Sequence, residues 1–200
     1  MCIHLQFNYK KATQALNFFA IKSRGKIGKL KALKLVFFAD RHHLRKHGRP
    51  ISNDEYWAME FGPVASSVKD IAENSEFLGK SERDYASSFI EPSGHNVVSR
   101  KGYDDKVFSK SDLESLDFAW KQFGHVRDFD LAKITHLYPE WKKHESVLKS
   151  KSQSRVKMRY EDFLEDPPAK AEKCFELNDR EKATRFEYLK EISKVKAMWS

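Results

Sequence analysis

The histidines are the first residues whose spacing could support chemistry. His43 and His47 are four residues apart and Asp40 is three residues before His43, so on a helix all three side chains share one face. Two imidazoles at this spacing can hold a metal ion. The Glu of a H-E-x-x-H site is absent, however, and neighbouring Arg and Lys side chains oppose a bound cation. We therefore predict a basic helix end exposed to solvent, with no metal and no other cofactor.

Nucleophilic catalysis finds no better support. Cys2 and Cys174 are far apart and have no His-Asp pattern nearby, so we expect reduced thiols in a cytoplasmic protein. Ser66 and Ser67 fit a helix cap better than a catalytic pair, and His136 stands alone. Two pairs of adjacent carboxylates occur, Asp104-Asp105 and Glu161-Asp162. Side chains of adjacent residues project in different directions, so neither pair can act together on one substrate. No acid, base and oxyanion site come together, so we predict that the protein is not an enzyme.

A stretch rich in aromatic residues, "GRPISNDEYWAMEFGPVASSV" at residues 48–68, raises a different possibility. Pro50 disfavours a helical conformation for Arg49, and Gly62-Pro63 turns the chain. We interpret the stretch as a rigid turn. Tyr56 and Phe61 are favoured to close the core, whereas an interface role is a stronger alternative for Trp57 and Arg49, because Trp, Tyr and Arg often anchor protein interfaces.

The elements that position these residues are mostly helical. Residues 9–24 carry one apolar stripe, and between Leu33 and Ala39 only Lys34 is polar. A helix that is apolar nearly all round is a buried one, so we predict a compact, mainly α domain around a central helix that stops at Gly48. We further expect a short helix ending near Asn74, a helix within 108–124 that is capped by Ser111 and Glu114 and stops at Gly124, and another over about 128–136. We also expect a small β-hairpin turning at Pro92-Ser93-Gly94, a mobile loop or linker over 142–159, and a charged C-terminal helix.

The charge distribution suggests a second class of partner. Residues 1–50 hold twelve Lys and Arg against one acidic residue. Such a bias can attract nucleic acid or simply be a solvated helix face. We see no helix-turn-helix, zinc finger or aromatic stacking platform, and no apolar run long enough to span a membrane. The candidate basic face consists of Lys22, Arg24, Lys26, Lys29, Arg41, Arg45 and Lys46.

Several blocks together resemble the SocA/Panacea antitoxin domain family, whose phage members are described as GepA-like. The resemblance covers about residues 10–165, and the blocks "FSKSDLESLDFAWKQFG" and "THLYPEW" belong to it. Phe37 stands where a Tyr is common, and Ala65 where a second Pro often follows. The matching residues are Lys34-Leu35, Phe38-Ala39-Asp40, Gly48-Arg49-Pro50-Ile51, Asp54, Tyr56, Ala58 and Gly62-Pro63-Val64.

The resemblance implies a mostly helical fold with a small β element and an antitoxin that binds and neutralises a toxin encoded beside it. Family members pair with unrelated toxin types, so it does not identify the toxin. In one branch the member is a proteolytic adaptor that delivers its toxin to a protease, and phage or prophage context is common. A nucleic-acid-binding regulator that uses the basic N-terminal third remains the alternative from another class.

These considerations divide the chain into an antitoxin-like domain at residues 1–166 and a charged helical extension at 167–200, which packs on the domain or on a partner. We expect a cytoplasmic protein with no membrane association. The candidate partner-binding residues are Arg49, Asp54, Tyr56, Trp57, Met59, Pro63, Val64 and Ser66.

Overall fold

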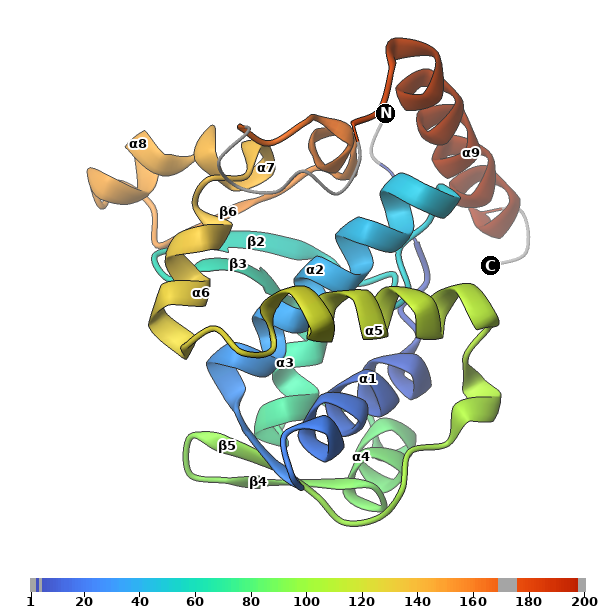
Figure 1. Cartoon of the computed structure of the whole chain (residues 1–200), viewed down its shortest axis with the longest axis vertical. Helices are drawn as coiled ribbons and strands as arrows, with labels where there is room; N and C mark the ends of the chain where they lie inside the picture. The colour runs from blue at the N-terminus through green and yellow to red at the C-terminus, as the bar shows by residue number, and fades with distance from the viewer. Residues whose placement is uncertain (1–2, 4, 169–175, 198–200) are drawn as a thin grey trace.

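Helices form most of the molecule in the computed structural model, which describes residues 3, 5–168 and 176–197 (Figure 1). Two small antiparallel sheets complete the fold, which confirms the predicted mainly α class. Cys2 and Cys174 lie outside the described residues. In chain order the elements are α1 (Tyr9–Lys22), β1 (Lys26–Gly28), α2 (Lys29–His47), β2 (Tyr56–Met59), β3 (Gly62–Ala65), α3 (Ser66–Glu73), α4 (Lys80–Ser87), β4 (Ile90–Ser93), β5 (Asn96–Ser99), the 3-10 turn η1 (Asp105–Val107), α5 (Lys110–Phe123), α6 (Asp128–Thr135), α7 (Pro139–Lys142), α8 (Glu145–Lys149), β6 (Arg155–Lys157), the 3-10 turn η2 (Tyr160–Leu164) and α9 (Asp179–Ala197).

Helix α2 is the predicted central helix. Its apolar side chains are almost fully buried, and the rings of Phe38 and Phe123 stack at 3.8 Å between α2 and α5. Gly48 ends the helix with φ of 79°, and its N–H donates to the carbonyl of Leu44 at 2.8 Å. A left-handed residue after the last turn is the usual role of a C-terminal glycine. The hydrophobic pattern therefore correctly predicted both the burial and the end of α2.

A buried carboxylate joins α5 to the rest of the helical core. Asp112 is fully buried and meets Lys11 of α1 at 2.5 Å, Arg49 at 3.1 Å and His43 of α2 at 3.2 Å. Burial alone would raise the pKa of Asp112, but hydrogen bonds from Lys11 and the Ser109 backbone and the nearby positive charges outweigh it and lower the pKa. Asp112 thus fixes the relative positions of three segments.

Each sheet has three strands, and the sheets lie at different ends of the helical layer (Figure 1). Strands β4 and β5 form the predicted hairpin, which turns at Gly94-His95 rather than at Pro92-Ser93-Gly94, and β1 pairs with β5. The second sheet has the order β3-β2-β6. The stretch at 48–68 is therefore a β-hairpin rather than only a rigid turn, and the expected mobile loop at 142–159 contains α8 and β6.

Helix α9 packs against the C-terminal end of α2. Leu189 is fully buried, Arg185 Nε donates to the Arg45 carbonyl at 3.3 Å, and Lys182 meets Asp166 at 2.9 Å. The ring of Tyr188 lies over Gly48, where a Cβ would sit 2.6 Å from it. Of the two sites expected for the C-terminal helix, the structure shows the first, on the domain itself. Among the described residues, no helix is long and apolar enough to cross a membrane.

Candidate partner-binding site

The hairpin of β2 and β3 separates its side chains onto two faces. Successive side chains on a strand point to opposite faces, and directly paired residues share a face. Trp57 pairs with Val64 and with Lys157, and Met59 pairs with Arg155. These five side chains lie on one face of the sheet, which we call the outer face. The other face, with Tyr56, Ala58, Pro63 and Ala65, is buried against the core.

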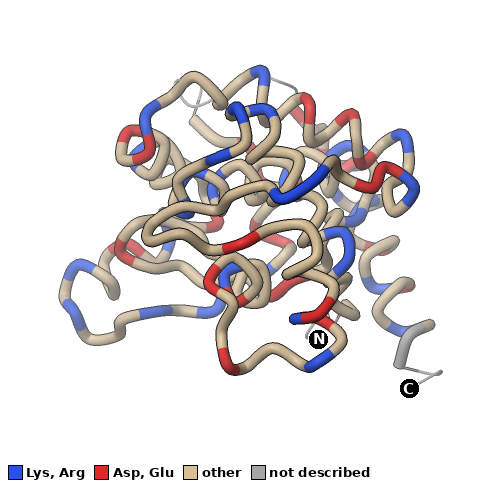
Figure 2. The backbone as a smooth tube through the Cα atoms, turned by 90° about the horizontal axis from the view of Figure 1, so that it is seen from below, with Lys and Arg blue, Asp and Glu red and all other residues tan. Residues whose placement is uncertain are grey.

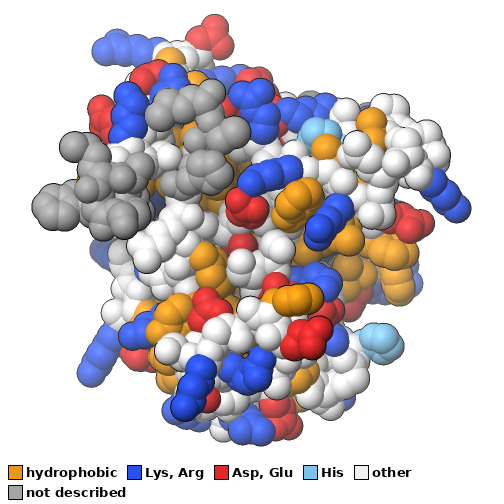
Figure 3. All heavy atoms as spheres, turned by 180° about the vertical axis from the view of Figure 1, so that it is seen from behind, with side chains coloured by type: hydrophobic (Ala, Val, Ile, Leu, Met, Phe, Trp, Pro, Cys, Tyr) orange, Lys and Arg blue, Asp and Glu red, His pale blue; other side chains and the backbone are white. Residues whose placement is uncertain are grey.

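The outer face combines partly exposed apolar side chains with basic ones. Trp57, Met59 and Val64 are each partly exposed. The Arg155 guanidinium lies over the Trp57 ring, 4.7 Å from its centroid, and Lys157 meets Glu55 at 2.5 Å. Figure 3 shows a side of the molecule on which hydrophobic side chains are interspersed with Lys and Arg. An aromatic residue with a stacked guanidinium is typical of a protein interface.

The turn of the hairpin adds two exposed aromatic rings. Phe61 is 55% exposed and contacts Phe129 of α6, which is 67% exposed, at a ring distance of 6.5 Å. The prediction that Phe61 closes the core was wrong, because it occupies the turn between β2 and β3, where no layer covers it. Phe129 was not singled out from the sequence, since its role depends on α6 lying beside the hairpin turn.

Asp40 holds the hairpin on the central helix. Its carboxylate is buried and accepts hydrogen bonds from the N–H groups of Ile51 and Ser52 at 2.8 and 3.0 Å, from the Ser52 hydroxyl, and from the Tyr56 hydroxyl at 2.9 Å. Burial raises the pKa of Asp40, although these hydrogen bonds oppose the rise. The "FAD", "GRPI" and Tyr56 blocks are thus parts of one buried network that positions β2.

Asp54 performs a second structural task at the start of the hairpin. Its carboxylate accepts from the N–H of Val68 and of Glu55, both at 2.7 Å, and so holds the start of α3. Burial raises its pKa to about 6. The Tyr160 hydroxyl donates to the Asp54 carbonyl at 2.5 Å. Because Asp54, Tyr56 and Pro63 are buried, their prediction as surface contacts is corrected: they support the hairpin from inside.

Two more side chains fix the hairpin turn. Lys34 of α2 is fully buried and donates to the Pro63 carbonyl at 2.7 Å, and Trp141 Nε1 donates to the Met59 carbonyl at 2.9 Å. Among the described residues no carboxylate pairs with Lys34, and burial lowers the pKa of its amine to about 7. The His136 ring stacks on Trp141 at 3.7 Å, so it packs beside the turn.

The remaining predicted contacts do not all belong to the outer face. Arg49 lies just after the end of α2, where it pairs with the buried Asp112 and helps to hold α5 against the helical core. Ser66 opens α3, is partly exposed, and donates its N–H to the Glu55 carbonyl at 2.9 Å. The structure therefore brings together Trp57, Met59 and Val64 from the predicted set. Arg155 and Lys157 were missed, because their position depends on a strand pairing across about 100 residues.

The predicted basic face does not form one surface. Arg41 and Arg45 are buried: Arg41 pairs with Glu140 at 2.8 Å, and Arg45 donates to the Leu164 carbonyl at 2.5 Å and pairs with Asp166. Figure 2 shows Lys and Arg distributed around the chain rather than gathered on one side. Of the others, Arg24 and Lys26 are exposed near β1, Lys29 is partly buried, Lys22 meets Asp117 and Lys46 meets Glu114.

The end of α2 is also not the solvated helix end that we expected. His43 is buried, with its Nδ1 2.7 Å from the Arg49 carbonyl and its Nε2 3.0 Å from the Ser111 hydroxyl. Burial lowers the pKa of His43 to about 4. The His47 ring lies 4.7 Å from the His43 ring and is tilted by 42° to it. In the described ranges no three His, Cys, Asp or Glu residues form a group that could hold a metal ion.

Comparison with known proteins identifies the family to which the chain belongs. Searches of curated proteins and of solved structures gave no significant match. The model of the family described as "Antitoxin SocA-like, Panacea domain" matches residues 33–142, which is more than half of the chain and includes most of α2, the hairpin of β2 and β3, and α5. The chain therefore belongs to the SocA-like antitoxin family with a Panacea domain.

Proposed function

We propose that this protein is an antitoxin that neutralises a cognate toxin by stoichiometric protein–protein contact rather than by catalysis. Membership of the SocA-like antitoxin family carries the proposal. The structure supports it with a rigid hairpin that presents Trp57 and Met59 outward. Its buried carboxylates, Asp40 and Asp54, are occupied by hydrogen bonds to the chain itself, which suits a structural role better than an acid–base role.

The contact is proposed to centre on the outer face. Interface hot spots are enriched in Trp, Tyr and Arg, and a surface held rigid before binding loses less entropy on association. Trp57 with Arg155 stacked on it meets the first condition. The hairpin meets the second condition, because the Tyr56 hydroxyl donates a hydrogen bond to Asp40 and the Pro63 carbonyl accepts one from Lys34.

Nucleic-acid binding is the weaker proposal on this structure. Arg41 and Arg45 are inside the molecule, and Lys22 and Lys46 have carboxylate neighbours, so few of the predicted cations remain for a continuous phosphate track. A DNA complex would also lose affinity steeply between low and moderate salt because counterions are released on binding. A partly apolar protein interface responds less.

The test is a growth assay with the product of the reading frame next to this gene. That product is induced alone and with this protein, and the two are then co-purified. Arrest by the neighbour, rescue by this protein and co-elution are the expected results. Toxin abundance is measured in the same cells, because a fall in abundance would indicate delivery to a protease rather than blocking.

Trp57→Ala tests the location of the contact. We expect at least a tenfold loss of toxin affinity, equivalent to about 1.4 kcal/mol or more. Phe77→Ala is the matched control, because Phe77 is an aromatic side chain that is 82% exposed between α3 and α4. Equal affinity of the two variants would place the contact elsewhere. A loss of helical circular dichroism in Trp57→Ala would show instead that Trp57 is needed for folding.

A further inference from the structure

Strand β6 has a free hydrogen-bonding edge. It is the outermost strand of the order β3-β2-β6, and the Met158 N–H donates to the Tyr56 carbonyl at 2.9 Å. Since alternate residues of an antiparallel strand direct their backbone groups to opposite sides, Val156 bonds to β2. Arg155 and Lys157 therefore direct their N–H and C=O groups away from the sheet. Within the described residues no third strand pairs with them.

The opposite edge of the same sheet is closed. Pro63 lies on the outer side of β3 and has no N–H to donate, and its carbonyl already accepts from Lys34 at 2.7 Å. A proline on an edge strand removes an N–H that another strand would need, and charged side chains such as Lys discourage pairing with a like-charged strand. β6 has no proline, but it carries Arg155 and Lys157, which would repel a basic strand. Within the part of the chain that the structure describes, the two edges of this sheet thus differ: Pro63 interrupts the β3 edge, whereas Arg155 and Lys157 of β6 direct backbone groups outward.

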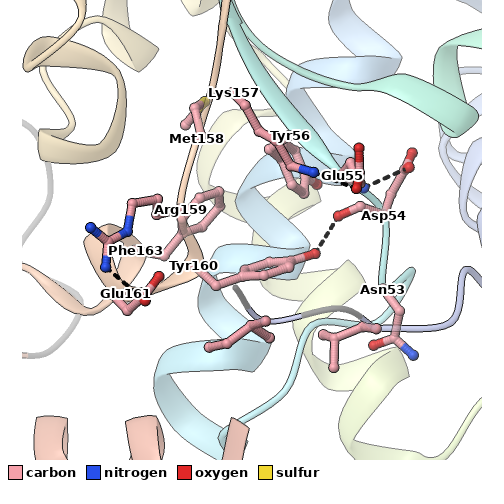
Figure 4. A pocket seen from close by; sticks show the side chains of 12 residues that line it. Asn53, Asp54, Glu55, Tyr56, Lys157, Met158, Arg159, Tyr160, Glu161 and Phe163 are labelled. Carbon is pink, nitrogen blue, oxygen red and sulfur yellow. Dashed lines mark hydrogen bonds and ion pairs between the residues drawn. The ribbon is translucent and has the colours of Figure 1, made fainter. Parts of the chain in front are cut away.

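A pocket opens at the C-terminal end of β6. It has a volume of about 370 Å³ and lies between the first residues of β2, the segment after β6 and the N-terminal residues Ile3 and Leu5. Tyr56, Tyr160 and Phe163 supply apolar surface, and the rim carries the ion pairs Lys157–Glu55 and Arg159–Glu161 (Figure 4). An apolar floor with a charged rim suits one large apolar side chain.

The charge around this edge selects the strand that it accepts. Residues 142–159 contain seven basic residues and one acidic residue. In the described part of the chain, Lys151 and Arg155 form no salt bridge, and both are exposed. Basic side chains on an edge repel a basic or identical strand, and they favour an acidic one. The charge therefore argues against a second copy of this chain as the occupant.

From these observations we propose that the β6 edge binds an extended, acidic segment of the toxin, which adds a strand to the sheet and inserts one apolar side chain into the neighbouring pocket. This inference rests on the proposed antitoxin function and specifies how its partner is held. Main-chain hydrogen bonds would supply affinity, and the pocket and the basic side chains would supply selectivity. The outer face with Trp57 would continue the same contact.

Two substitutions at one position separate the backbone from the side chain. Lys157→Pro removes the outward N–H and leaves the bonds of Val156 to β2 in place, because proline is tolerated where an edge N–H faces solvent. Lys157→Ala is the matched control, since it also removes the ion pair with Glu55 but keeps the N–H. Affinity is measured by titration calorimetry with toxin recovered from the co-purified complex.

We expect Lys157→Pro to bind the toxin at least tenfold more weakly than Lys157→Ala, with equal urea midpoints for the two variants. Hydrogen exchange gives a second readout that needs no substitution: the amides of Arg155 and Lys157 should exchange fast in the free protein and slowly in the wild-type complex.

Equal affinities of the two variants, together with unchanged exchange in a complex that does form, would overturn the edge inference and leave the antitoxin function standing. Slow exchange that appears with protein concentration alone would identify a second copy as the occupant and would also overturn it. Failure of the wild-type chain to bind any toxin would overturn both proposals.

Discussion

We predict that the stability of the protein depends on pH through the buried amine of Lys34. Lys34 is fully buried, and its only hydrogen bond to the described chain is the one to the Pro63 carbonyl. Burial lowers its pKa from 10.5 to about 7. Between these two values the unfolded chain binds one more proton than the folded one. The free energy of unfolding should therefore rise as pH increases across this window.

The size of the effect follows from the shift. One bound proton gives a slope of about 1.4 kcal/mol per pH unit, which amounts to about 2.5 kcal/mol between pH 7.5 and 9.5 when the partial titration of the folded state is included. Lys34→Met keeps a similar side-chain volume and removes the titrating group. We expect the stability of the wild type relative to Lys34→Met to increase by this amount over the interval.

Urea denaturation of both proteins at pH 7.5 and 9.5 is the assay. All other titrating groups are common to both chains, so their contributions cancel in the difference. The absolute stability of Lys34→Met at one pH is not decisive, because the variant loses the bond to Pro63 as well as the charge. Parallel stability profiles, with a difference that does not change between the two pH values, would refute the reasoning and show that Lys34 titrates in the folded protein as it does in the unfolded chain.

Substitutions at two further positions test the supports of the hairpin and of the central helix. Asp40→Ala leaves buried donors of Ile51, Ser52 and Tyr56 without an acceptor and should reduce the free energy of unfolding by about 4 kcal/mol, whereas Asp40→Asn, which keeps one acceptor oxygen, should lose less. Equal losses in the two variants by urea denaturation would contradict the assigned network. Gly48→Ala forces a left-handed conformation on alanine and places a Cβ 2.6 Å from the Tyr188 ring, so we expect a loss of about 1–2 kcal/mol and faster hydrogen exchange in α9. Unchanged exchange in α9 would show that α9 does not depend on this contact.

The helices of the fold could be predicted because their signals are local. The apolar run around Leu35 and Phe38 requires a buried helix wherever it lies, and Gly48 can adopt the left-handed conformation that ends it. Both signals lie within a few residues of the structure that they specify. The hairpin of β4 and β5 was predictable for the same reason, apart from the position of its turn.

The sheet that carries the candidate site could not be predicted in this way. Arg155–Lys157 has a Ser- and Lys-rich neighbourhood that is typical of a loop, and it becomes a strand because β2 offers it a hydrogen-bonding edge about 100 residues away. The tendency of a residue to adopt a β-strand depends mainly on the strands and side chains that it packs against. Trp57 was recognised as an interface candidate, but its guanidinium partner and its outward direction follow only from the pairing.

The burial of charged side chains was the other feature that the sequence did not predict. Arg41 and Arg45 were predicted to be exposed because arginine is rarely buried without a partner. Their partners, Glu140 and the segment around Asp166, come from distant parts of the chain. Additional hydrogen bonds offset the cost of burying a charge, and here the carbonyls of Phe163 and Leu164 in η2 accept from Arg45. No local pattern in the sequence predicts these ion pairs.

The residues that carry the family resemblance and the residues proposed to contact a partner are largely different sets, and of the outer-face residues only Val64 belongs to both. Asp40, Tyr56 and Lys34, which carry the family resemblance, are buried and form hydrogen bonds that hold the hairpin. Trp57 and Arg155, which lie on the outer face, form none of these bonds. A change on the outer face would therefore alter the contact surface while the supports of the hairpin remain intact. We infer that one buried framework can present different contact surfaces when the residues of the outer face change.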